Sequence, residues 1–192
     1  MEALKRAIEE MGSGIGTDIV KVDCFLNHRI DTGLLFQMGD ALAEHFAKDK
    51  PDLVLTVEAS GIALATATAH ALHDIPIVFA KKSAALNQSP DMAEAEICSF
   101  TRKQTCCIRV DLKYIPRGSR VLIVDDFLAD GQAVQGMRSL IRQAGAELIG
   151  VGIAIEKGFQ QGGQKLRESG INLLSLAVVE AIQDGNILCR DC

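Results

Sequence analysis

The chain lacks the features that mark nucleic-acid binders and membrane proteins. Its 25 acidic residues outweigh 20 basic ones and give a net charge of −5. A general nucleic-acid binder needs a basic face, so this balance argues against that function. No apolar run approaches the roughly 20 residues that span a bilayer. The first ten residues predict a charged amphipathic helix and not a signal peptide, so we expect a cytosolic protein.

The sequence is also poor in patterns that hold metals or form hydrolytic triads. None of the four histidines pairs with a cysteine or a carboxylate at metal-ligand spacing. The six cysteines should be thiols in a reducing compartment. Cys189 and Cys192 have C-x-x-C spacing, but no second pair completes a zinc site. We therefore expect no metal held by protein side chains alone, and no Ser-His-Asp or Cys-His arrangement can be inferred.

What is present is the pattern of an α/β protein. A chain of 192 residues with 48% hydrophobic residues supports one domain with a sizeable core. Apolar runs predict buried strands at 53–57, 76–80, 121–124, 148–155 and 171–176. Helical spacing predicts helices at 2–11, 33–48, 61–72, 131–144 and 163–169. This alternation predicts a mostly parallel central sheet with right-handed crossovers.

The remaining segments are predicted from turn residues and short runs. Residues 18–27 are expected to be extended, and 83–95 to form a long loop. Residues 97–101 and 106–111 are expected to pair as strands, and Asp184-Gly185 to turn a hairpin.

The most informative stretch reads VLIVDDFLADGQA at residues 121–133. An apolar run that suits a strand buried on both faces ends in Asp125 and Asp126, and small residues lead into a helix. Ligands of parallel sheets bind at the carboxyl ends of strands. Carboxylates accept bonds from sugar hydroxyls and bare N–H groups hold phosphate, so the stretch predicts a sugar-phosphate site. A buried strand that ends in two solvated acids would give the same pattern.

A second turn of small residues, EASG at 58–61, follows the strand at 53–57 and opens a helix. Such a turn suits the close approach of an anion. Lys81 and Lys82 end the next strand and form either a solvated pair or a cation beside both turns. The loop after them is interpreted as a lid, since an oxocarbenium-like transition state must be shielded from water.

These motifs resemble the signature of the type I phosphoribosyltransferases, and the whole chain resembles the bacterial xanthine-specific subfamily. The resemblance rests on MEALKR at the start, VKVDCFLNH from Val20, EASGI from Glu58, PIVFAKK from Pro76, SFT from Ser99, DDFLADGQA from Asp125 and IEKGFQ from Ile155. It implies the type I phosphoribosyltransferase fold, which is a mostly parallel sheet flanked by helices. A hood over the sheet, from about 1–35 and 157–192, and a lid at about 83–105 would complete it.

The resemblance also implies a reaction and its site. The 5-phosphoribosyl group of 5-phospho-α-D-ribose 1-diphosphate would pass to N9 of xanthine, with magnesium on the diphosphate and a homodimer as the assembly. No nucleic acid or membrane is implied as a partner. Asp125 and Asp126 would be catalytic and hold the ribose hydroxyls. The 5′-phosphate would lie on Ala129, Asp130, Gly131, Gln132 and Ala133, and the diphosphate on Ala59, Ser60, Gly61 and Lys82. Subfamily members tend to have Asn where Asp130 stands, and a carboxylate there would repel phosphate unless it points away.

The purine base would contact Val20, Asn27 and Lys157, again by resemblance. Val20 offers an apolar face, while the Asn27 amide and the Lys157 ammonium can both donate. Two donors facing two oxo groups favour xanthine over adenine. Hypoxanthine would leave a buried donor unpaired, at a cost of about 1–3 kcal/mol, and guanine would set donor against donor. From the residues alone, Asn27 would be a turn residue and Lys157 a solvated strand end.

Two alternatives stay open. A purine-responsive regulator could carry a related domain that binds the sugar diphosphate without chemistry. It would need a DNA-binding domain, whereas this acidic chain is expected to begin directly with the hood. An oxopurine transferase that prefers guanine or hypoxanthine would share the sugar-phosphate residues and differ in its contacts at Asn27 and Lys157.

Overall fold

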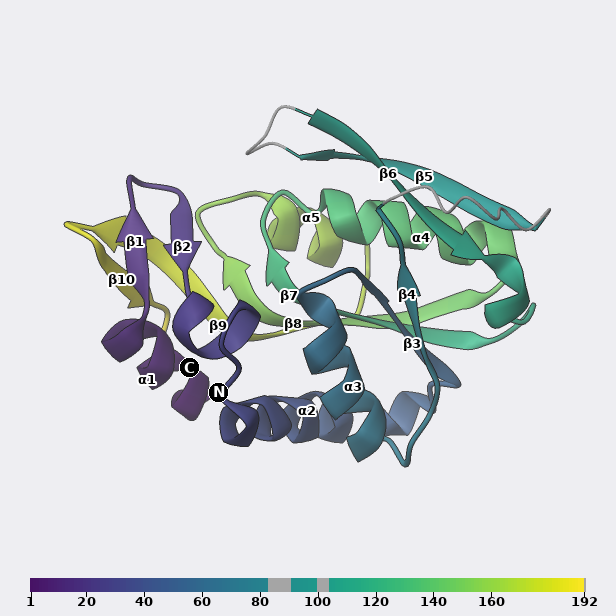
Figure 1. The fold of residues 1–192 in the computed structure, drawn as a ribbon, viewed down its shortest axis with the longest axis horizontal. Helices are drawn as coiled ribbons and strands as arrows, with labels where there is room; N and C mark the ends of the chain where they lie inside the picture. Colours follow the sequence, from purple (N-terminus) through teal and green to yellow (C-terminus); the bar gives the residue numbers. More distant parts are fainter. Residues whose placement is uncertain (83–90, 100–103, 192) are drawn as a thin grey trace.

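The computed structural model describes residues 1–82, 91–99 and 104–191, and a six-stranded sheet forms the centre of this part (Figure 1). The strand order is β10-β9-β8-β7-β3-β4, with β10 antiparallel to β9 and the other neighbours parallel. The strands are β3 (Leu53–Val57), β4 (Ile77–Ala80), β7 (Arg120–Leu128), β8 (Glu147–Lys157), β9 (Leu173–Gln183) and β10 (Asn186–Cys189). The predicted parallel sheet is confirmed, although β9 runs well beyond the predicted 171–176.

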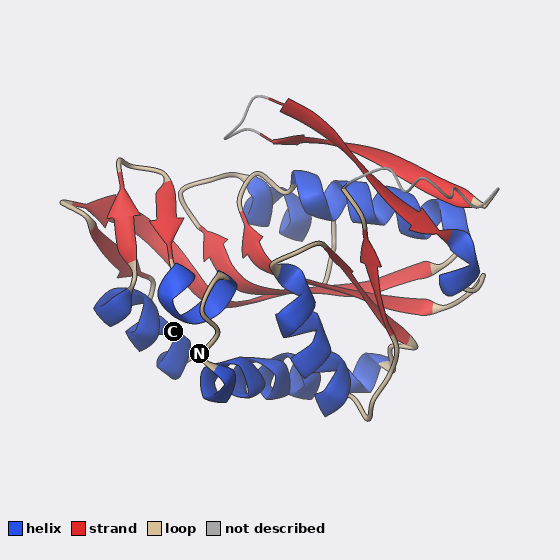
Figure 2. Ribbon diagram, in the orientation of Figure 1, coloured by secondary structure: helices blue, strands red, loops and turns tan. Residues whose placement is uncertain are grey.

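Helices cover both faces of the sheet (Figure 2). One face carries α2 (Thr32–Phe46) and α3 (Gly61–Ala71), and the other carries α4 (Gln132–Ala144) and α5 (Gly162–Glu168). In β7, Leu122 and Val124 join the core with α2 and α3, whereas Val121 and Ile123 join the core with α4. Side chains alternate between the faces of a strand, so burial on both faces requires an unbroken apolar run.

Helix ends follow the capping residues in the sequence. Asp31 precedes α2, and its carboxylate accepts the Leu34 N–H at 3.0 Å. α4 stops at Gly145, whose φ of 68° is left-handed, as predicted for a glycine just past a helix. Short 3₁₀ turns lie at Ala47–Asp49 and Leu112–Tyr114. None of the helices in the described part of the chain has the length and apolar character that a bilayer crossing requires.

The two ends of the chain lie side by side, next to β9 (Figure 1). α1 (Glu2–Met11) leads into a hairpin of β1 (Ser13–Ile15) and β2 (Ile19–Lys21). The Gly14 N–H donates to the Gly185 carbonyl at 2.8 Å, and Lys5 pairs with Asp191 at 2.5 Å. Gly185 belongs to the predicted hairpin turn, which has positive φ at Asp184 and Gly185. β9 and β10 extend the central sheet, so the segment expected as a C-terminal hood also forms one end of that sheet.

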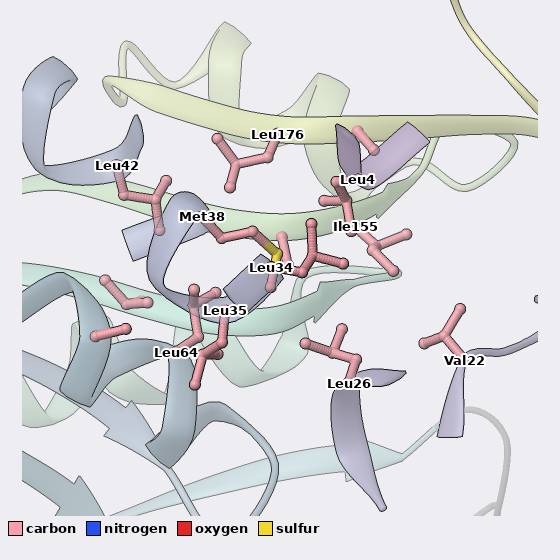
Figure 3. Close-up of a cluster of buried hydrophobic side chains, with 14 of the residues drawn as sticks. Leu4, Val22, Leu26, Leu34, Leu35, Met38, Leu42, Leu64, Ile155 and Leu176 are labelled. Carbon is pink, nitrogen blue, oxygen red and sulfur yellow. The ribbon is translucent and has the colours of Figure 1, made fainter. Parts of the chain in front are cut away.

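Leucine and methionine side chains join α2 to these terminal elements (Figure 3). Leu34, Leu35, Met38 and Leu42 of α2 lie in one cluster with Leu4 of α1, and all five are buried. The core under α2 therefore anchors the N-terminal segment, including the β1–β2 hairpin, against the sheet.

The extended conformation predicted for residues 18–27 is wrong in its second half. After β2, residues Asp23–Asn27 form one helical turn. Phe25 and Leu26 are neighbours, yet both are buried. An extended chain would send them to opposite sides, so burial of both favours a turn.

The long loop predicted for residues 83–95 is wrong from Met92 onward. β5 (Met92–Ser99) pairs antiparallel with β6 (Gln104–Asp111). Ala93, Ala95 and Ile97 alternate with Glu94 and Glu96, and the apolar three are buried. This period of two was the missed signal of a strand that packs on α4. Residues 83–90 and 100–103, the rest of the expected lid, lie outside the described residues.

Candidate active site

The candidate site residues gather at the carboxyl edge of β3, β4, β7 and β8. These four strands are neighbours and run parallel, so their ends and the turns that follow meet at one edge. The β7–α4 loop and the β8–α5 loop also touch, because the Gly162 N–H donates to the Ala129 carbonyl at 3.1 Å. The β1–β2 hairpin reaches this edge through Lys157, whose ammonium donates to the Asp18 carbonyl at 2.7 Å.

Asp125 and Asp126 lie inside β7 and not at its end, which corrects the expectation from the sequence. β7 continues to Leu128, and the residues Asp125 and Asp126 are only 4% and 6% exposed. The alternative of two solvated acids at a strand end is therefore wrong. Asp126 follows Val124 on the α2 face and accepts a hydrogen bond from the Asn27 amide at 3.3 Å.

Asp125 lies against the start of α3. A Cβ on Gly61 would stand 2.6 Å from Asp125 Oδ1 and 2.3 Å from Thr56 Oγ1. Both distances are too short for a carbon atom, so only glycine fits at this position without a shift of its neighbours. Burial raises the pKa of Asp125 well above its usual range, and the charge of Asp126 raises it further, while Lys82 acts in the opposite direction. The Thr56 hydroxyl is buried and has no hydrogen-bond partner among the described residues.

The turn from β3 into α3 is tied to the end of β4. Glu58 Oε1 accepts the backbone N–H of Lys82 at 2.6 Å, so the two predicted anion-binding segments are joined. Ser60 stands at the N-cap of α3, but its side chain makes no capping bond. The hydroxyl lies next to the backbone of Ala59 and Gly61, the other residues of this turn that were predicted to bind an anion. Sequence reasoning missed the role of Glu58, although its place directly after a buried strand was a usable signal.

The loop between β7 and α4 holds its own carboxylate. Asp130 Oδ1 accepts the Gln132 N–H at 3.1 Å, so one of the N–H groups predicted to bind phosphate already has a partner. Asp130 Oδ2 is buried and has no hydrogen-bond partner among the described residues. Gly131 adopts φ 86°, which a glycine tolerates without strain. Ala133 lies in the first turn of α4.

Two of the predicted base contacts lie near consecutive residues of β7, Asp126 and Phe127. Asn27 donates a hydrogen bond to Asp126. The Lys157 ammonium lies 6.0 Å from the ring centre of Phe127, which follows Asp126 in β7. Burial lowers the pKa of Lys157, and the charge of Asp18 partly offsets this. Val20 is buried in the adjoining hairpin. The sequence analysis did not predict that Phe127 lies near Lys157, because an aromatic residue after an acidic pair is equally typical of the hydrophobic core.

The carboxylates of the candidate site could supply only some of the ligands of a magnesium ion, and substrate oxygens and water would have to supply the others. In the described part of the chain, no group of three or more His, Cys, Asp or Glu side chains is arranged to hold a metal. Asp125 and Asp126 supply hard oxygen atoms, but burial favours a proton on Asp125. An ion that keeps several waters and binds substrate phosphates needs no more protein ligands than this.

Comparisons with known proteins agree on one family. A family model described as the phosphoribosyl transferase domain matches residues 30–168. The chain is 47% identical over 190 residues to a protein of Clostridioides difficile named xanthine phosphoribosyltransferase, with 99% of this chain and all of that protein covered. A protein of the same name from Heliobacterium modesticaldum is 49% identical over 188 residues, covering 98% and 99%. The solved adenine phosphoribosyltransferase of Rhodothermus marinus superposes with a TM-score of 0.74 at 26% identity, covering 93% and 97%.

Proposed function

Because the chain belongs to the phosphoribosyltransferase family, we propose that it is a pentosyltransferase of purine salvage that acts on xanthine. Both the family and the fold expected from the sequence are confirmed. In the reaction, N9 of xanthine bonds to C1′ of 5-phospho-α-D-ribose 1-diphosphate, and the proton of N9 passes to the departing diphosphate or to water. The bond from C1′ to the diphosphate oxygen breaks, so that xanthosine 5′-monophosphate and diphosphate are released.

The single observation that carries this proposal is the hydrogen bond from Asn27 to Asp126 Oδ2. Base and ribose are joined at C1′, so a base contact and a ribose contact must lie within a few ångströms of each other. Asn27 and Asp126 meet this requirement, although they stand 99 positions apart in the chain.

The sugar phosphate would be held by three segments. Asp125 and Asp126 bind the ribose hydroxyls, and residues 129–133 receive the 5′-phosphate on backbone N–H groups and the start of α4. The diphosphate lies on the turn of Ala59, Ser60 and Gly61, with Lys82 supplying positive charge. Catalysis then consists of positioning and of neutralising the leaving diphosphate. The proposed lid at 83–105 would exclude water from C1′.

The base would be selected by donors. Asn27 keeps one amide hydrogen after donating to Asp126, and Lys157 keeps two after donating to Asp18. Each can meet one oxo group of xanthine. Val20 supports the apolar face of the ring. The names of the relatives from Clostridioides difficile and Heliobacterium modesticaldum support the same base.

The proposal includes magnesium, a homodimer and a cytoplasmic location. Magnesium would neutralise the diphosphate, and Asp125 or Asp126 could contribute an oxygen ligand or hold a bound water. Within the described part of the chain, Cys24, Cys106 and Cys107 are free thiols, which suits a reducing compartment.

The test is a direct assay. The purified protein is incubated with 5-phosphoribosyl 1-diphosphate, magnesium and xanthine, guanine, hypoxanthine or adenine in turn, and the nucleotides are separated by chromatography. We expect product chiefly with xanthine. Product chiefly with guanine or hypoxanthine would retain the transferase and overturn the base. No product with any base, while the sugar diphosphate still binds, would favour a regulator.

A further inference from the structure

An ion pair between a buried carboxylate, Glu156, and a half-exposed arginine, Arg167, lies next to the candidate site. Glu156, next to Lys157 in β8, is 4% exposed. Its two carboxylate oxygens accept bonds from both terminal nitrogens of Arg167 in α5, at 2.8 and 2.6 Å, and from the Ser175 hydroxyl in β9 at 2.5 Å. Three short donors around one carboxylate form a satisfied network, which fixes β8, α5 and β9 relative to one another.

The charge on Glu156 is maintained by these donors. Burial by itself would raise the pKa of Glu156, but the hydrogen bonds from Arg167 and Ser175 bring it below its usual value. The pairing geometry is the fork of a guanidinium on a carboxylate, which resists rotation better than a single bond.

The first turn of α5 is wedged between this ion pair and the β7–α4 loop. A Cβ on Gly163 would stand 1.9 Å from Glu156 Oε1, and one on Gly162 would stand 2.3 Å from the Ala129 carbonyl oxygen. Gly162 also donates its N–H to that carbonyl. The two adjacent glycines thus allow close contact with the carboxylate on one side and with the candidate phosphate loop on the other.

We propose that Glu156 and Arg167 are positioning residues that hold the phosphate loop at residues 129–133 in its binding geometry, acting through Gly162 and Gly163. This inference rests on the proposed function, because it takes that loop as the phosphate site. Neither side chain needs to touch a substrate. The pair acts by fixing the first turn of α5, against which the Ala129 carbonyl and the Gly131 backbone rest.

The test compares Arg167→Lys and Arg167→Met with the wild type. Lysine keeps the charge but loses the fork, and methionine leaves Glu156 uncompensated. We expect KM for 5-phosphoribosyl 1-diphosphate to rise about tenfold in Arg167→Lys, while kcat and KM for xanthine stay within twofold. A merely structural role would move both KM values together or neither.

Arg120→Lys is the matched control. Arg120 and Glu147 form an ion pair of 3.4 Å at the starts of β7 and β8, at the opposite end of the same strands. In this pair one guanidinium nitrogen meets the carboxylate, without the fork of Arg167, and Arg120 Nε also donates to the Asp49 carbonyl at 3.0 Å. The variant removes these arginine contacts far from the candidate site and should keep both KM values.

Hydrogen exchange gives a second readout that does not depend on activity. Amides of residues 129–133 should exchange faster in Arg167→Met than in the wild type, while amides of α3 keep their protection. If Arg167→Met does not fold, Arg167→Lys replaces it. Unchanged exchange at 129–133 together with an unchanged KM would overturn the inference. A wild type that forms no nucleotide from any base would overturn the proposed function instead, and exchange alone would then decide the inference.

Discussion

The side-chain amide of Asn27 donates to Asp126 Oδ2 across 3.3 Å. The donor lies in the helical turn Asp23–Asn27 of the N-terminal segment, and the acceptor lies in the central strand β7. The contact therefore joins the part of the chain proposed to hold the base to the part proposed to hold the ribose. It also fixes the amide so that its nitrogen points toward β7, which constrains how Asn27 can meet a purine.

Asp126→Asn should lower kcat by at least about a hundredfold while leaving the fold intact. A carboxylate accepts hydrogen bonds on both oxygens, whereas an amide nitrogen can only donate, so one ribose hydroxyl would lose its acceptor. Steady-state kinetics and a thermal melt check this. A variant within twofold of wild-type turnover would remove Asp126 from catalysis.

Asp125→Asn should lower activity yet raise stability at neutral and alkaline pH. Folding raises the pKa of Asp125, so the stability that this group contributes is present at low pH and is lost as pH rises from about 4 through the raised value. Asparagine keeps the acceptor for the Asp126 N–H and carries no charge. The melting temperature at pH 8 should rise by about 2–4 °C for each kcal/mol gained.

The same variant gives a pH profile that checks the sign. The stability advantage of Asp125→Asn should shrink as pH falls from 8 toward about 4, because a pKa raised by folding makes acid stabilise the folded wild type. Thermal melts across this range provide the measurement. An advantage that grows with acidity would show that Asp125 is charged and stabilised in the folded state.

Asn27→Asp should shift base preference from xanthine toward guanine. A carboxylate accepts a hydrogen bond from the guanine amino group, whereas the N–H of the asparagine amide would face that amino group as a second donor. Total activity should also fall, because the new carboxylate stands beside Asp126. The informative quantity is therefore the ratio of kcat/KM for xanthine to that for guanine, in which a general loss cancels. An unchanged ratio would remove Asn27 from base selection.

Asp130→Asn should lower KM for 5-phosphoribosyl 1-diphosphate by about three- to tenfold with little change in kcat. Asparagine retains an oxygen to accept the Gln132 N–H, which keeps the loop folded, and removes one negative charge from the candidate phosphate site. Asp130→Ala serves as the comparison, since it removes both charge and acceptor. A KM that rises or stays equal in Asp130→Asn would place the phosphate elsewhere.

Most elements of the fold could be predicted from patterns of residues that are close in sequence. The apolar run in β7, the period of α2 and the left-handed Gly145 after α4 each depend on residues close in sequence, and the structure confirms them. The part of β5 before Ile97 was missed, although the alternation of Ala93, Glu94, Ala95 and Glu96 is local, because a proline and weak periodicity nearby suggested a loop. The predicted pairing of the strand that begins at Ile97 with the next strand is confirmed.

The sequence by itself determined the alternation of strands and helices, the acidic pair in β7 and the turns of small residues that follow β3 and β7. Only the tertiary structure decided that Asp125 and Asp126 are buried, that Asn27 bonds to Asp126, and that Glu156 meets Arg167 beside the first turn of α5. The reason is physical. Burial and hydrogen bonds between distant residues depend on strand order and on how each segment packs, whereas propensity and periodicity act only along neighbouring residues.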